Sequence, residues 1–276
     1  MEIKETAYIY RLSAGEKLAW HGRFHSHGEN EFEIHFFSEG SGIFFSNKAS
    51  HPISGGSLFL TSPREFHSIL PDKVTSPLTY YAVLFSLSQA ENSLYQLLIH
   101  PEAKRRHSAR ESEIPALRFI LEDILKLSKS PSFHMKKSAA LLLESCLYRW
   151  FGKSAAGSHG KKSRAAQSAA ARQHVADALK YMERNVCESR SIAQVASSCG
   201  ISEEHLIRIF KAEMQMTPYQ YFTRLKIQMA SLALLSSSCP VSKVASDFSF
   251  ENQFHFSRVF KKCTGMAPSL YRSAYT

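Results

Sequence analysis

The first hundred residues alternate short apolar runs with clusters of Gly, Pro, Ser and Asn. The apolar runs are EFEIHFF at 31–37, GIFF at 42–45, SLFL at 57–60 and TYYAVLFSL at 79–87. Turn-forming residues separate them, as in SEGSG at 38–42. Short strands at close intervals are typical of an antiparallel sandwich or barrel. The pattern therefore predicts a β-barrel over residues 1–111.

Helical spacing replaces this alternation after residue 111. Leu117, Leu121 and Ile124 recur three or four positions apart, and Ser112 is a candidate N-cap. A second set of apolar residues follows over 134–151. The spacing predicts two amphipathic helices within 112–151. Two interpretations are open, because these helices could cover the barrel or could join two subunits of a homodimer.

The segment 152–171 has the opposite character. It reads GKSAAGSHGKKSRAAQSAAA, with basic residues but no acidic residue and no large apolar one. Such a segment cannot contribute to a core, so it predicts a flexible basic linker. Its Ala-rich end could continue into the next helix, since everything from residue 172 onward has a helical pattern.

The helical region 172–276 contains an internal repeat. VASSCGISEEHLIRIFKAEMQMTPYQY at 195–221 matches VASDFSFENQFHFSRVFKKCTGMAPSLY at 244–271. The offset is 49 residues at Val195 and Val244, and it becomes 50 at Arg208 and Arg258. Two aligned blocks separated by one inserted residue indicate a structural duplication. Each copy predicts a short helix, a turn and a second helix.

The second helix of each copy has one apolar face and one polar face. Leu206, Ile209 and Phe210 predict the buried stripe in the first copy. A stripe opposed by Arg, Asn, Gln and His suits a helix in the DNA major groove, where Arg pairs with guanine and Asn or Gln with adenine. The terminal lysines would contact phosphates. The predicted DNA contacts are Glu204, His205, Arg208, Lys211, Asn252, Gln253, His255, Arg258, Lys261 and Lys262.

A continuous amphipathic helix is predicted between the copies, over 217–238. Thr217 is a suitable N-cap, and Pro218 suits the first helical position. A helix of about 20 residues spans roughly 30 Å. That length is close to one turn of B-DNA, about 34 Å, so one chain could place two recognition helices in successive major grooves.

In these motifs the chain resembles the AraC/XylS family of transcription regulators. The resemblance covers about 172–276 and is most specific in DFSFENQFHFSRVFKKCTGMAPSLYR, with SIAQVASSCGISEEHLIRIFK and RLKIQMASLALL elsewhere. Ser249 and Gln215 depart from the family pattern, which usually has glycine there, and Lys226 replaces the usual arginine. The resemblance implies a regulator, expected to be an activator, that recruits RNA polymerase.

The N-terminal segment resembles the two motifs of a cupin barrel, over about 15–90. The motif residues are His25, His27, Glu33, Gly40 and His67. Alternation predicts His25 and His27 on one strand face, with Glu33 opposite them. The resemblance implies a sensor that binds a small effector, with a carbohydrate as the guess. The predicted effector contacts are Phe24, His25, His27, Glu33 and His67.

The alternative hypothesis uses the same barrel residues for catalysis. His25, His27, Glu33 and His67 match a three-His, one-carboxylate site for divalent iron, manganese or zinc. The chain would then be a metal-dependent cupin enzyme fused to a DNA-binding domain. In the favoured interpretation the chain is not an enzyme and requires no cofactor.

Charge and composition agree with a DNA-binding partner. The formal net charge is +10 over 276 residues, and the basic excess lies in the C-terminal half. Apolar runs stay far below the roughly 20 residues of a membrane helix. The N-terminus lacks the apolar stretch of a signal peptide, and the five cysteines form no CxxC pair, which predicts reduced thiols in a cytoplasmic protein. The predicted fold class is α+β, with a barrel followed by an all-α double helix-turn-helix domain.

Overall fold

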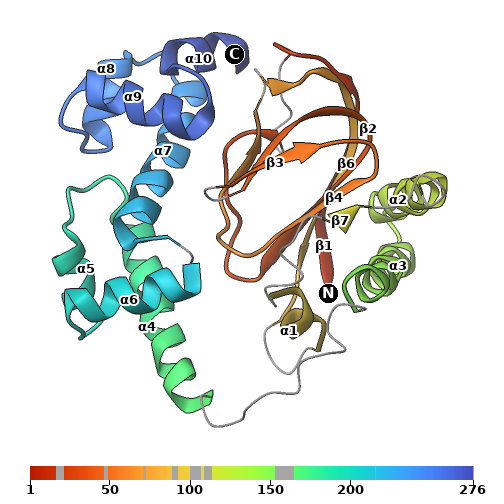
Figure 1. The fold of residues 1–276 in the computed structure, drawn as a ribbon, viewed down its shortest axis with the longest axis horizontal. Coiled ribbons are helices and arrows are strands. Elements are labelled where there is room, and N and C mark those ends of the chain that lie inside the picture. The colour runs from red at the N-terminus through yellow and green to blue at the C-terminus, as the bar shows by residue number, and fades with distance from the viewer. Residues whose placement is uncertain are drawn as a thin grey trace. The chain divides into compact units, whose positions relative to one another are not determined.

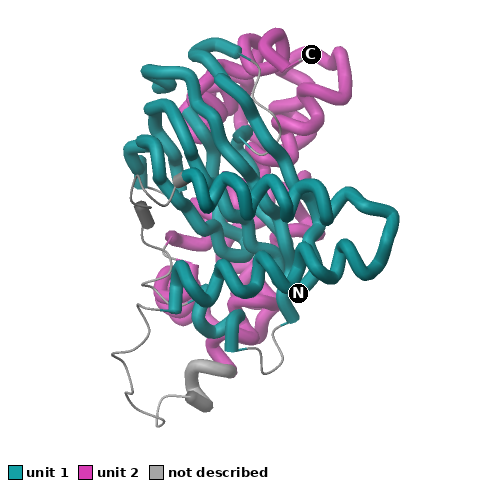
Figure 2. Tube along the Cα trace, turned by 90° about the vertical axis from the view of Figure 1, so that its right-hand side faces the viewer, with its two compact units in different colours: residues 1–158 teal, residues 159–276 magenta. Residues whose placement is uncertain are grey.

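The computed structural model describes residues 1–16, 22–46, 49–70, 73–88, 93–99, 107–108, 114–152, 165–214 and 216–275. The chain forms two compact units, 1–158 and 159–276 (Figure 2). The expectations for Ser112, Gln215 and most of the 152–171 linker lie outside the described residues. Each unit is described by itself.

Unit 1 is built on an antiparallel sheet, as the alternating pattern predicts (Figure 1). The strand order is β1-β6-β2-β4-β7, and β3 and β5 both pair with β2. The strands are β1 (Glu2–Leu12), β2 (Glu31–Ser46), β3 (Ala49–Ile53), β4 (Ser57–Thr61), β5 (His67–Ile69), β6 (Ser76–Ser86) and β7 (His107–Ser108).

Strand β2 belongs to both halves of the barrel. Its first part pairs with β4 up to Phe37 and with β6 up to Ser41, and its last part, from Gly42, pairs with β3 and β5. Gly40 lies just before the change of partners, at an irregularity in the pairing with β6, with φ at 94°. A Cβ atom added there would lie 2.2 Å from the carbonyl oxygen of Pro77. Gly40 therefore has both a left-handed backbone and a close backbone neighbour, and only glycine fits.

We expect Gly40→Ala to lower the free energy of unfolding of unit 1 by about 3 kcal/mol, since strain and clash add. Gly15→Ala is the matched control, because Gly15 has φ at 79° but no atom within 4 Å of the added Cβ. That control should cost only about 1 kcal/mol. Urea unfolding of both variants measures the difference, and equal losses would contradict the close approach at Gly40.

Three helices cover one face of the sheet in unit 1 (Figure 1). They are α1 (Ser93–Ile99), α2 (Ile114–Ser128) and α3 (Phe133–Phe151). Their buried side chains, Leu121 and Leu143 among them, join a core with Phe32, Ile34 and other residues of that sheet face. The covering interpretation of these helices is confirmed. Leu141, one of the apolar residues in the 134–151 set, does not join this core and is 55% exposed.

Unit 2 is entirely helical in its described part. It contains α4 (Ala165–Arg184), α5 (Ile192–Ser198), α6 (Glu203–Met214), α7 (Pro218–Ser236), α8 (Val241–Asp247), α9 (Gln253–Thr264) and α10 (Pro268–Tyr275). Helix α4 begins before the expected boundary at residue 172, as the Ala-rich end of the linker allowed. Helix α7 runs between the α5/α6 pair and the α8/α9 pair (Figure 1). Thr217 caps α7 by accepting a hydrogen bond from the Gln220 amide, with Pro218 in the first turn, as predicted.

Two buried or half-buried cations connect α7 to the segments around it. The Lys226 ammonium donates to the carbonyl oxygens of Glu188, at 2.8 Å, and Phe248, at 3.1 Å. Arg272 of α10 donates to the carbonyl oxygen of Leu234, at the C-terminal end of α7. These bonds join α7 to the segment before α5, to the turn after α8 and to α10, so the lysine that departs from the family pattern still serves as a connecting cation.

Two further expectations concern membrane-spanning segments and the state of the cysteines. Among the described residues, no helix combines the length and apolarity that crossing a membrane requires. All five cysteines are free thiols, as their spacing predicts.

Candidate functional site

The two helix-turn-helix units have the same turn. The Ile201 amide donates to the Ala196 carbonyl at 3.2 Å, and the Phe250 amide donates to the Ala245 carbonyl at 2.9 Å. Gly200 and Ser249 occupy equivalent places in these turns, with φ at 68° and 55°. The duplication read from the sequence is therefore confirmed in the backbone.

The N-caps of α6 and α9, the second helix of each unit and the predicted recognition helix, locate the inserted residue. The Ser202 hydroxyl accepts from the His205 amide at 3.2 Å, and the Asn252 side chain accepts from the His255 amide at 2.8 Å. The caps are 50 positions apart, whereas the turn residues Ile201 and Phe250 are 49 apart. The extra residue of the second copy is therefore Glu251.

Ser249 holds a backbone conformation that usually belongs to glycine, as its departure from the family pattern suggested. Its hydroxyl donates to the Cys187 carbonyl at 2.6 Å, which ties the second turn to the segment after α4. A serine can therefore replace glycine here because a hydrogen bond offsets the strain.

We expect Ser249→Ala to lower the free energy of unfolding of unit 2 by about 1 kcal/mol, because it keeps the strain and removes the bond. Ser249→Gly removes both and should stay within about 0.5 kcal/mol of the parent. Thermal unfolding of the two variants compares them directly. A glycine variant less stable than the alanine variant would contradict this explanation.

The apolar stripe of each recognition helix is buried as predicted. Leu206, Ile209 and Phe210 are buried in α6, and Phe256 and Phe260 are buried in α9. The predicted DNA contacts lie on the outward face. Glu204, Arg208, Lys211, Asn252, Gln253, Arg258, Lys261 and Lys262 are exposed, and His205 and His255 are half-buried. Each unit therefore presents a polar helix face to solvent with an arginine and a lysine at equivalent positions, and this face is strongly basic in α9.

Three features modify this outward face. Arg208 donates to His205 Nδ1 at 3.2 Å, which orients the guanidinium along the helix. The carboxamide oxygen of Asn252 is used as a helix cap, so only its amide group points outward for a partner. Phe254, which sequence analysis missed, is 85% exposed on α9. The repeat could have found it, because it occupies the position of Glu204, and an apolar ring there suits a thymine methyl group.

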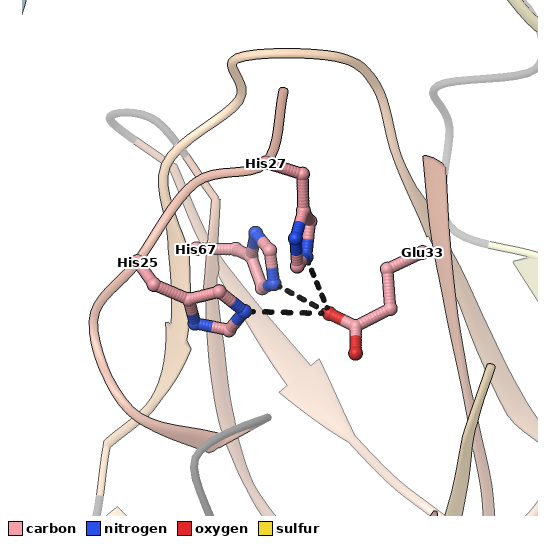
Figure 3. Close-up of side chains that lie close together, drawn as sticks. All are labelled: His25, His27, Glu33 and His67. Atoms are coloured by element: carbon pink, nitrogen blue, oxygen red, sulfur yellow. Dashed lines mark hydrogen bonds and ion pairs between the residues drawn. The ribbon is translucent and has the colours of Figure 1, made fainter. Parts of the chain in front are cut away.

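A second cluster lies in the barrel of unit 1. His25, His27, Glu33 and His67 each offer one ligand atom, and these atoms lie within 4.8 Å of one another (Figure 3). Glu33 Oε2 lies 2.8 Å from His67 Nε2, 3.0 Å from His27 Nε2 and 3.6 Å from His25 Nε2. The structure thus brings together the four side chains that the cupin-like motifs predicted.

The backbone that positions these histidines differs from the prediction. His25 and His27 do not share the face of a regular strand, because their segment forms only an isolated bridge between His25 and His67. The reason is a long-range pairing, with the His67 amide donating to the His25 carbonyl at 2.9 Å. Phe24, a predicted effector contact, is 2% exposed and stacks on Phe66.

Burial controls the charge of the cluster. It lowers the pKa of His25 to about 4, with the nearby His67 adding to the effect and Glu33 opposing it. Burial also lowers the pKa of His27.

His35, which sequence analysis missed, lies fully buried with Nε2 3.6 Å from Glu33 Oε2. The alternation in EFEIH could have found it, because residues 33 and 35 share one strand face.

Unit 1 is a barrel with a buried polar centre, and unit 2 contains two helix-turn-helix units. This combination defines a ligand-responsive DNA-binding regulator. The model of the AraC-like ligand binding domain matches residues 7–149, and that of a helix-turn-helix domain matches 195–274. The chain belongs to the AraC family of transcription regulators.

Two relatives align with this chain over most of their own length. An uncharacterized HTH-type transcriptional regulator of Bacillus subtilis, YfiF, is 25% identical over 90% of this chain and 79% of its own length. The raffinose operon transcriptional regulatory protein RafR of Pediococcus pentosaceus is 22% identical over 89% of this chain and 86% of its own. A solved structure of ToxT from Vibrio cholerae covers 100% of both chains, with a TM-score of 0.55 and 13% identity, and supports the fold.

Proposed function

We propose that this AraC-family regulator is a transcription activator that places α6 and α9 in successive major grooves of one operator. The observation that carries this proposal is the matched pair of exposed polar helix faces, with Arg208 and Arg258, and Lys211 and Lys261, at equivalent positions. The stiff α7 between them contains 19 residues, which corresponds to roughly 28 Å. Promoter contact then recruits RNA polymerase in the cytoplasm.

The experiment that tests this activity has two stages. Selection from random duplex DNA with the full chain should yield a bipartite site. A reporter with that site upstream of a weak promoter should then show increased transcription when the chain is present. Decreased transcription would make the chain a repressor, and failure to enrich any sequence would overturn sequence-specific recognition.

We also propose that a small effector bound in the barrel controls this activity, and that the effector is a carbohydrate. The buried His and Glu side chains offer hydrogen-bond partners for hydroxyl groups, and RafR, a relative over most of its length, is named for a raffinose operon. Calorimetry with a panel of oligosaccharides, raffinose included, tests the effector class. Heat of binding that vanishes in Glu33→Gln would support it, and the absence of any heat would exclude sugars.

Coupling between the units is proposed to run through the 152–171 segment. A protease site inserted within this segment should release a C-terminal fragment whose DNA affinity no longer responds to the effector. Effector control that persists after cleavage would refute this route.

A homodimer through α2 and α3 is proposed as the subunit arrangement. Phe119, Phe133 and Leu141 are exposed on these helices at 69%, 74% and 55%. Sedimentation of the full chain should give a dimer that Leu141→Glu dissociates. An unchanged sedimentation coefficient would place the subunit contact elsewhere or exclude it.

The metal-dependent enzyme is kept as a second candidate because the four barrel side chains converge. The relatives described above are transcriptional regulators, so we propose that the barrel acts as a sensor and not as a catalyst.

A further inference from the structure

We propose that the barrel binds a divalent first-row transition-metal ion through His25, His27, Glu33 and His67. These side chains come from three separate segments of unit 1 and converge on one point (Figure 3). An ion held there would contact effector hydroxyl groups in place of the direct hydrogen bonds from these side chains. The metal test below uses no effector and no DNA, so its outcome is distinguishable from that of the proposed function.

The outer hydrogen bonds fix which nitrogen of two histidines faces the cluster. His25 Nδ1 lies 2.7 Å from the Arg23 carbonyl oxygen, and His67 Nδ1 lies 3.0 Å from the Glu65 carbonyl oxygen. A carbonyl only accepts, so each Nδ1 carries the hydrogen and donates it. In a neutral ring the Nε2 lone pair then points inward. This backbone-anchored arrangement is the usual outer shell of metal-binding histidines.

The inner distances then require a positive charge. His67 Nε2 lies 2.8 Å from Glu33 Oε2, and with Nδ1 protonated both of these atoms are acceptors in their ordinary states. Two acceptor atoms repel each other at 2.8 Å, so His67 Nε2 and Glu33 Oε2 need a proton or a cation between them. The Nε2 atoms of His27 and His25 lie 3.0 Å and 3.6 Å from the same Glu33 oxygen, so one dipositive ion at this point would contact all three rings, whereas a proton would serve a single pair.

The burial of Glu33 strengthens this requirement. Its side chain is 0% exposed, and an ionised carboxylate without a compensating charge is costly in such a place. One carboxylate with three neutral imidazoles carries a single negative charge, which a divalent ion neutralises. Imidazole-rich sets of this kind favour zinc, iron, nickel or copper over magnesium or calcium.

The size of the cluster fits one ion. Metal bonds to imidazole and carboxylate are about 2.0–2.2 Å long, so two ligand atoms of one ion can be at most about 4.4 Å apart. The four ligand atoms lie within 4.8 Å of one another. Small side-chain rotations would close this difference and move the Glu33 oxygen away from the centre. The competing explanation is a proton shared by the same groups.

The test uses the full chain, stripped with a chelator and titrated with Co²⁺ and Zn²⁺. We expect one equivalent of Co²⁺ per chain with visible d–d absorption, displacement by Zn²⁺, and a melting temperature of unit 1 that rises by several degrees with Zn²⁺. Wild-type protein that binds neither ion would establish the shared proton and overturn the metal site.

Variants locate the ion. Glu33→Gln and His67→Gln should lose the d–d absorption, and circular dichroism would establish that each variant is folded. The matched controls are Glu39→Gln, an exposed carboxylate on the same strand, and His51→Gln on β3, which should both retain it. Absorption that persists in folded Glu33→Gln and His67→Gln, or that disappears in the controls, would place the ion elsewhere and overturn the proposal.

Discussion

Replacing Arg258 with alanine is expected to weaken binding to the selected operator by about 1–3 kcal/mol, or roughly 5- to 150-fold. The reason is the loss of paired hydrogen bonds to a guanine edge from the exposed face of α9. Fluorescence anisotropy at fixed salt measures this loss, on the operator and on scrambled DNA. The loss should be much larger on the operator.

Arg258→Lys separates base reading from phosphate contact. Lysine keeps the charge but not the planar fork of donors, so the base preference should relax while binding to scrambled DNA stays nearly constant. Lys4→Ala, in the other unit, removes one charge as a control and should leave both affinities unchanged. If Arg258→Ala weakens operator and scrambled DNA equally, Arg258 is a phosphate contact and not a base contact.

Replacing Lys226 with methionine is expected to lower the free energy of unfolding of unit 2 by about 2–4 kcal/mol. The variant keeps most of the side-chain volume but leaves the carbonyls of Glu188 and Phe248 without the charged donor. The burial that lowers the pKa of Lys226 also means that water replaces this donor poorly. Thermal unfolding measures the loss, and hydrogen exchange of the α7 amides locates it.

Two further variants test the cause of that loss. Lys226→Arg should stay within about 1 kcal/mol of the parent, because arginine can donate to both carbonyls. Lys180→Met, at an exposed position of α4, should change the free energy of unfolding by less than about 0.5 kcal/mol. A loss in Lys226→Met no larger than that in Lys180→Met would show that the two carbonyls do not depend on this lysine.

The sequence predicted those parts of the fold that depend on local pattern. The repeat, the Thr217 cap and the buried stripe of α6 all follow from spacing and from residue types within a few positions. The positive φ at Ser249 could also be anticipated, because the repeat aligns it with Gly200.

The parts that escaped prediction depend on contacts between distant residues. The bridge between His25 and His67 joins segments that no local pattern connects. The carbonyl partners of Lys226 lie 38 and 22 positions away in the chain. The exposure of Phe254 differs from these, because it contradicts the usual burial of phenylalanine but follows from the alignment of the repeat with Glu204.

The central claim is that two equivalent helices, α6 and α9, joined by α7, bind one duplex together through matching arginines. Methylation interference on the selected operator tests it most directly, with the parent chain, Arg208→Ala and Arg258→Ala compared. We predict two major-groove contact patches about one helical turn apart, with each variant losing a different patch. A single patch, or two patches that both survive in both variants, would contradict the claim.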